Sequence, residues 1–124
     1  MPAPVHAFER SFGVLEHALQ VSLLRHRTIE SNLAHADTPG YKRLEVNFES
    51  LLEDRLAGGP VDPRVFRSVQ PAVVADTSPG KADGNNVELD RESSELEKNR
   101  LQYEVLSEIA SQRFSGLKQV IQSK

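Results

Sequence analysis

The residues best suited to bind a metal ion are four histidines, at positions 6, 17, 26 and 35. A helix that binds a metal ion usually carries two histidines four residues apart, so that both side chains reach the same ion. Here successive histidines are nine or eleven residues apart. That spacing puts them on different faces of a helix or too far apart. We therefore expect exposed histidines or histidines in the helix seam, and predict neither a metal site nor a bound cofactor.

The carboxylates Glu92, Glu95 and Glu97 are the residues most suggestive of acid–base catalysis. Such catalysis also needs a pocket and a reacting partner, and no nucleophile or glycine-rich loop accompanies them. We expect these three residues to form a solvated helix face. The chain has no cysteine, which excludes disulfides and thiolate catalysis. The sequence thus predicts no catalytic residues and no enzyme.

Length and charge restrict the remaining possibilities. The chain has 124 residues, which predicts a single domain, 1–124. Its 15 basic and 18 acidic residues are well mixed and give a net charge of −3, which does not suit a nucleic-acid partner. The first residues do not include a basic segment followed by an apolar stretch, so we do not expect a cleaved signal peptide. The apolar run at 19–24 is too short for membrane insertion.

A long N-terminal helix is predicted over residues 4–36. Apolar residues recur there in alternating steps of three and four, which is typical of a helix that packs along one seam, and Ser22 and His26 interrupt the seam. The single Gly13 costs only about 1 kcal/mol relative to alanine. The seam residues expected to pack or assemble are Phe8, Phe12, Leu15, Leu19, Ile29 and Leu33.

A turn and a short helix are predicted over residues 37–57. Pro39 disfavours a helical Thr38, and Gly40 suits the turn position that needs a positive φ, so a type II turn is expected at 38–41. After an extended stretch, Asn47 is a candidate cap for a small helix over 47–57. Residues 58–86, rich in proline and glycine, are expected to be a flexible loop with at most one short extended piece near 69–75.

A second long helix is predicted over residues 87–122. Asn86 is its candidate cap, and Glu88 and Asp90 bring negative charge to its first turn, where the helix dipole favours it. Asn99 and Arg113 are polar members of its seam. The residues expected to pack or assemble are Leu96, Tyr103, Leu106, Ala110, Leu117 and Val120.

Further apolar residues widen the apolar surface of this helix beyond one seam, which indicates more than one neighbour. The predicted fold is therefore all-α: two long terminal helices pair as an antiparallel, coiled-coil-like hairpin around a largely irregular middle. The N-terminal seam from Phe8 to Leu19 is expected to face the C-terminal seam from Leu106 to Val120.

The stretch from Ser31 to Arg43 closely resembles the N-terminal signature of the flagellar basal-body rod protein family, in which a long helix is followed by Thr-Pro-Gly-Tyr. The stretch Gly84 to Glu92 is similar to the segment that opens the C-terminal helix in short, proximal members of that family. The matching residues are Asn32, Leu33, Ala34, Ala36, Thr38, Pro39, Gly40, Tyr41 and Lys42 in the first stretch, and Asn85, Asn86, Val87, Glu88 and Asp90 in the second.

The resemblance implies a structural subunit of the proximal rod, whose terminal helices polymerise into a hollow tube. It implies export by the flagellar type III apparatus without a cleaved signal, and a place in the periplasmic part of the basal body. The implied partners are copies of the chain, other rod subunits, the inner-membrane ring with its rod adaptor, and the export apparatus. Another short rod subunit remains open, as does a cytoplasmic helical adaptor or export chaperone.

Overall fold

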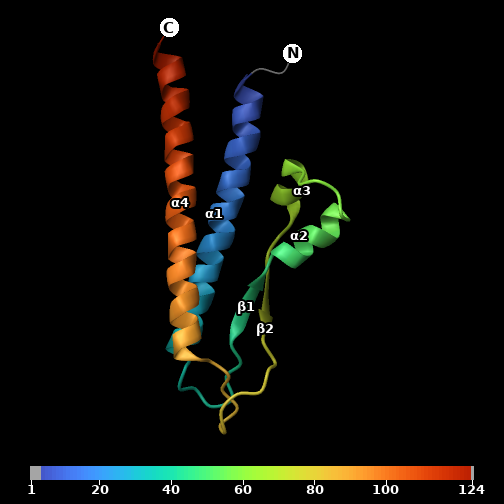
Figure 1. Ribbon diagram of the computed structural model, residues 1–124, viewed down its shortest axis with the longest axis vertical. Helices are drawn as coiled ribbons and strands as arrows, with labels where there is room; N and C mark the ends of the chain where they lie inside the picture. Colours follow the sequence, from blue (N-terminus) through green and yellow to red (C-terminus); the bar gives the residue numbers. More distant parts are fainter. Residues whose placement is uncertain (1–3, 124) are drawn as a thin grey trace.

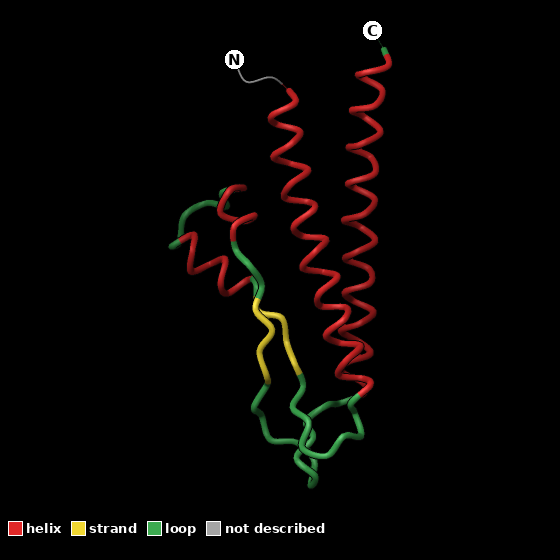
Figure 2. The backbone as a smooth tube through the Cα atoms, turned by 180° about the vertical axis from the view of Figure 1, so that it is seen from behind, coloured by secondary structure: helices red, strands yellow, loops and turns green. Residues whose placement is uncertain are grey.

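The computed structural model describes the backbone of residues 4–123 and the side chains of residues 9–123. The long helices α1 (Pro4–Ala34) and α4 (Leu89–Gln122) lie side by side and antiparallel. On the other side of α1 lies an arm, residues 44–75, which the tube in Figure 2 shows from behind. The arm consists of β1 (Leu44–Asn47), α2 (Glu49–Leu56), α3 (Pro63–Ser68) and β2 (Ala72–Ala75).

The two long terminal helices that the sequence predicts are confirmed, but the purely all-α class is not. Strands β1 and β2 form an antiparallel pair with Leu44 opposite Ala75 and Asn47 opposite Ala72. Helix α1 ends at Ala34 rather than at residue 36. Beyond that point the backbone tightens, since the N–H of Ala36 donates to the carbonyl of Leu33, only three residues earlier.

The predicted helix caps are wrong at both Asn47 and Asn86. Asn47 is the last residue of β1. Phe48 precedes α2 and makes no side-chain capping bond, because its ring has no hydrogen-bonding atom; the ring is buried instead. Glu88, not Asn86, precedes α4, and it makes no side-chain capping bond either. The negative first turn is confirmed at Asp90.

The middle of the chain is more regular than a flexible loop. Helix α3 was not expected, although Asp62 and Pro63 form a recognisable start: the Asp62 side chain accepts from the N–H of Arg64, and Pro63 needs no donor in the first turn. The extended piece expected near 69–75 is confirmed as β2, which begins directly after Pro71.

The arm packs on α1 through a small core of Val21, Phe48 and Val69. His17 of α1 lies beside it, with its ring 5.6 Å from that of Phe48 and its Nε2 2.7 Å from the carbonyl oxygen of Val69. Thus His17 is buried against the arm and lies outside the seam between α1 and α4. The side chains of His6 and Phe8 lie outside the described residues.

Burial is concentrated near the lower end of the helix pair. Figures 1 and 2 show α1 and α4 closest together there and diverging toward the two chain ends. Helix α4 buries Glu92 and Asn99, both in its first third, and no residue further along it is buried. Among the described helices, none combines the length and the hydrophobicity that a membrane crossing requires.

Candidate assembly site: the polar junction at the base of the helix pair

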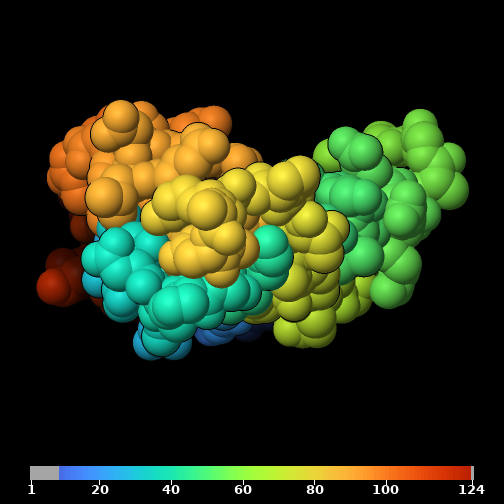
Figure 3. All heavy atoms as spheres, turned by 90° about the horizontal axis from the view of Figure 1, so that it is seen from below, coloured from blue at the N-terminus to red at the C-terminus, as the bar shows by residue number. Residues whose placement is uncertain are grey.

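The two stretches that carry the family resemblance meet at the base of the molecule. Figure 3, seen from below, shows the segment that follows α1 lying directly against the segment that precedes α4. We call this region, residues 32–45 together with 76–92, the base junction. It is held mainly by hydrogen bonds and ion pairs, so its polar contacts decide what it can do.

Asn32 is the centre of the base junction and is completely buried. Its Oδ1 accepts from the N–H of Leu44 at 2.8 Å and from the hydroxyl of Tyr41 at 3.0 Å. Its Nδ2 donates to the carbonyl of Leu44 at 2.9 Å and to Glu92 at 3.2 Å. The side-chain amide thus pairs with both backbone groups of Leu44, as a neighbouring strand would, and attaches β1 to α1.

The turn at 38–41 has the predicted geometry. Gly40 has φ +74°, and the N–H of Tyr41 donates to the carbonyl of Thr38 at 3.2 Å. The N–H of Gly40 donates to Asp83, so the turn also contacts the segment before α4. The Tyr41 ring stacks on His35 with the ring centroids 4.7 Å apart. The turn therefore folds the chain back onto the end of α1.

Asn85 and Lys81 bind carbonyl groups of the turn that directly follows α1. Asn85 is completely buried, and its Nδ2 donates to the carbonyls of His35 and Thr38, each at 2.9 Å. The Lys81 ammonium donates to the carbonyl of the buried Ala36 at 3.1 Å. The segment before α4 therefore holds the turn that follows α1 in place.

Asn86 links three backbone segments instead of capping α4. Its Oδ1 accepts from the N–H of Arg43 at 2.6 Å, while its Nδ2 donates to the carbonyls of Asp76 and Ser78. Val87 follows and is buried, whereas Glu88 and Pro39 are exposed. Asn86 thus joins the strand pair to the start of α4.

Arg43 carries the charge at the base junction and is buried among three carboxylates. Its Nε donates to Glu92 at 2.6 Å, and its Nη1 contacts Asp76 at 3.2 Å and also Glu45. Burial by itself lowers the pKa of Arg43, but the bonds to Glu92, Glu45 and Asp76 outweigh it and raise that pKa. Hydrogen bonds from Ser78, followed by the bond to Arg43, lower the pKa of Asp76 to about 2.

Glu92 corrects the expectation of a solvated acidic face. It is completely buried and bonded to Arg43 and Asn32, whereas Glu95 and Glu97 are exposed as expected. Among the described residues, no buried side-chain nitrogen or oxygen lacks a hydrogen-bond partner. The buried polar side chains of the junction are therefore paired within the chain.

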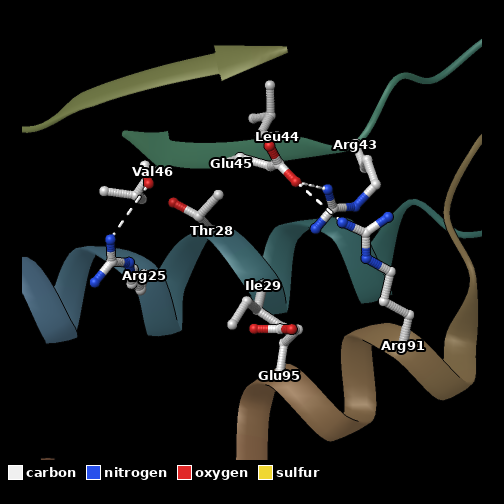
Figure 4. Close-up of a pocket in the computed structure, with 9 residues that line it drawn as sticks. All are labelled: Arg25, Thr28, Ile29, Arg43, Leu44, Glu45, Val46, Arg91 and Glu95. Atoms are coloured by element: carbon white, nitrogen blue, oxygen red, sulfur yellow. Dashed lines mark hydrogen bonds and ion pairs between the residues drawn. The ribbon is translucent and has the colours of Figure 1, made fainter. Parts of the chain in front are cut away.

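A cavity of about 280 Å³ opens between α1, β1 and α4, beside Arg43 (Figure 4). Arg43 and Arg91 converge there on the carboxylate of Glu45. A third arginine, Arg25, binds Glu49 and the carbonyl of Val46. Since each arginine of this cavity already has a carboxylate partner in the chain, we assign it a structural role.

The predicted packing residues divide into two groups. Leu15 and Ile29 are buried and Phe12, Leu19 and Leu33 half-buried on α1, while Leu96, Leu106, Ala110 and Leu117 are half-buried on α4. Tyr103 and Val120 are exposed in the single chain, at 40% and 63%. Their packing within the chain is therefore not observed, and their role in assembly stays a prediction.

Arg43, Asp76 and Lys81 are junction residues that the sequence reasoning missed. Apart from Glu45 and Ser78, which are each two residues from their partner, the residues that their side chains bond are 33 to 49 residues away along the chain, so no local pattern connects them. Glu92 did carry a signal, because it lies four residues before Leu96 and seven before Asn99, on the predicted seam. The seam pattern should have outweighed its charge.

No protein-family model matches the chain, but curated relatives do. It is 32% identical over 121 residues to the flagellar basal body rod protein FlgB of Aeromonas hydrophila, covering 90% of this chain and 92% of that protein. It is 32% identical to FlgB of Bacillus subtilis strain 168, covering 92% and 95%, and 29% identical to FlgB of Escherichia coli K12, covering 87% and 90%. The chain belongs to the FlgB family of flagellar basal body rod proteins, the structural subunits of the rod.

Proposed function

We propose that this chain is a subunit of the proximal rod and that it polymerises through α1 and α4 into a hollow helical tube. The tube would link the inner-membrane ring and its rod adaptor to the distal rod. The chain would reach the periplasm through the flagellar type III apparatus without a cleaved signal, and would act as a structural component and not as an enzyme. Membership of the FlgB family supports the location, and the surface of α4 supports the polymerisation.

The observation that carries the proposal is the large apolar surface that α4 leaves open. Six of its large apolar side chains beyond Asn99 are exposed, with exposed fractions between 40% and 65%. Large apolar side chains gathered on an exposed surface often mark a contact with another protein. The residues concerned are Leu101, Tyr103, Val105, Phe114, Val120 and Ile121.

These side chains point in more than one direction. At 100° per residue, Leu101 and Val105 are turned about 160° and 120° away from Asn99, which faces α1. Phe114 is turned about 60° from it and flanks the α1 side. Helix α1 cannot cover both faces of α4, so at least one other subunit is needed beside α4. When one surface of a subunit binds a different surface of the next subunit, the contact is heterologous. Repeated heterologous contacts generate a helical polymer if their rotation does not close a ring.

Electron microscopy of basal bodies from a strain lacking the gene tests this proposal. We expect rings without a rod, and restoration of the rod by the wild-type gene. Phe114→Asp should leave the free energy of unfolding of the purified chain within about 0.5 kcal/mol of wild type, because the ring is exposed. Thermal unfolding measures this. The same variant should fail to restore the rod, whereas the matched control Glu108→Gln on the same helix should restore it.

Intact rods in the deletion strain would overturn the proposal. Recovery of the tagged protein from the cytosol, and not from basal bodies, would instead support an adaptor or export chaperone. Full complementation by both Phe114→Asp and Leu101→Asp would remove the role assigned to the open face of α4 while leaving the family membership untouched.

A further inference from the structure

One buried polar contact between α1 and α4 lies outside the base junction and within the apolar seam. Asn99 donates from Nδ2 to the backbone carbonyl of Ser22 at 2.8 Å, and the Ser22 hydroxyl donates to its Oδ1 at 3.3 Å. Both residues are buried, with exposed fractions of 4% and 5%. The amide of Asn99 is therefore satisfied by a single residue of the facing helix.

We propose that Asn99 and Ser22 are positioning residues that set the angle at which α4 crosses α1. The base junction holds the first turn of α4 through Glu92 and Asn32. A single contact near one end leaves the direction of a helix open, and the bond from Arg113 of α4 to Ser11 of α1 further along is exposed, so it constrains that direction less than a buried contact does. The second buried contact, at Asn99, is seven residues past Glu92 on α4, about 10 Å away. Two separated contacts define the direction of a helix.

The polar chemistry makes this second contact specific. One heptad before or after Ser22 on α1 are Leu15 and Ile29, both buried and apolar. If α4 shifted or rolled so that Asn99 faced either of them, no side chain there could donate to its Oδ1, and that oxygen would be buried without a partner, at a cost of about 1–3 kcal/mol. A single polar residue in an apolar helix seam fixes register in this way, usually at some loss of stability.

The consequence lies beyond Asn99, where α4 has no buried residue. Its open half diverges from α1 (Figure 1), and the crossing angle decides where its exposed side chains lie. Ser111 is twelve residues past Asn99, so a change of about 20° in the crossing angle, comparable to the scatter between helix pairs, moves it by about 6 Å. The step from crossing angle to assembly rests on the proposed function. The proposal that Asn99 and Ser22 set the crossing angle does not.

Distances between spin labels on cysteines test the proposal, because the chain has no cysteine of its own. One pair, at Glu16 and Ser111, lies beyond the contact; a reference pair, at Arg27 and Ser94, lies between the contact and the junction. All four positions are exposed. We expect Asn99→Leu to shift or broaden the distance between positions 16 and 111 by about 6 Å. The reference distance should stay as in wild type, and the melting temperature should be no lower than in wild type.

Matched variants separate positioning from simple stabilisation. Ser22→Ala removes the donor to Oδ1 of Asn99 but keeps the bond from Nδ2 to the backbone carbonyl, so it should change the distance between positions 16 and 111 less than Asn99→Leu does. Asn99→Ala, which cannot overpack the seam, should reproduce the shift seen with leucine. An unchanged distance between positions 16 and 111 in both Asn99 variants would overturn the proposal. A lowered melting temperature with unchanged distances would overturn it too, because it would indicate an ordinary stabilising contact.

Complementation of the deletion strain tests the consequence for assembly. Asn99→Leu, folded but with an altered distance, should restore fewer rods than Ser22→Ala. Normal rods with an altered distance would refute the link to assembly and leave the positioning role intact. Intact rods in the deletion strain would refute the proposed function and not the crossing angle.

Discussion

Replacing Asn32 by alanine tests whether the base junction depends on one side-chain amide. The change removes all four hydrogen bonds of a completely buried side chain. Glu92 keeps Arg43 as a partner, and the Tyr41 hydroxyl can turn toward solvent, but both backbone groups of Leu44 that faced Asn32 are left unpaired. Each unpaired buried group costs about 1–3 kcal/mol, and we expect a total loss of about 3 kcal/mol in the free energy of unfolding.

Urea unfolding of the purified chain, followed by circular dichroism, measures this loss. With a slope of about 2 kcal/mol per molar, the midpoint should fall by about 1.5 M. Asn32→Asp should be at least as destabilising at neutral pH, because it places a second carboxylate against Glu92. The control Asn47→Ala removes a half-buried amide for which the described structure gives no side-chain hydrogen bond, and should change the free energy by less than about 0.5 kcal/mol. A loss below about 1 kcal/mol in Asn32→Ala would refute this account of the junction.

Three further substitutions probe the charges and the turn of the base junction. Glu92→Gln should lower the free energy of unfolding, measured with urea, by about 3 kcal/mol. This is the lower end for breaking a buried ion pair, because Arg43 retains two carboxylates. The exposed control Glu95→Gln should lower it by less than about 0.5 kcal/mol. Gly40→Val should lower the free energy of unfolding by about 1–3 kcal/mol, because φ is +74° there. The cost comes from the backbone and not from a clash, since no atom lies within 4 Å of the added Cβ. An unchanged urea midpoint would contradict this. The pKa of Asp76 is lowered from 3.8 to about 2, so its contribution to stability is complete above the higher value and is lost as the pH falls toward the lower one. The stability difference between wild type and Asp76→Asn should accordingly shrink between pH 4 and pH 2, and a difference independent of pH would contradict the assignment.

The features that the sequence predicts correctly depend on local chemistry. Periodic apolar residues produce α1 and α4. The turn follows because Pro39 disfavours a helical Thr38 and Gly40 permits a positive φ. The start of α3 is also local, because Asp62 and Pro63 are an ordinary helix start. It was overlooked because the surrounding glycines and prolines dominated the composition of that segment.

The features that could not be predicted depend on contacts between distant segments. Asn86 is an ordinary helix-cap residue by type, yet it serves the backbone of Arg43, 43 residues earlier. No pattern in one sequence indicates which of several polar residues will be drawn into such a network. Arg43 likewise reads as a surface residue until the fold brings Glu92 and Asp76 to it.

The chain separates the two tasks of a building block by the chemistry of its surfaces. At the base, polar groups are buried and paired inside the chain, and such pairs specify a shape better than apolar packing does, because a misplaced polar group is costly. At the open end, apolar groups such as Phe114 and Ile121 remain exposed. Burying them stabilises a contact almost independently of its direction. A subunit with only the second property would associate in many ways. Since the base junction and the Asn99 contact determine where α4 points, they leave the exposed apolar residues few arrangements in which a neighbour can cover them.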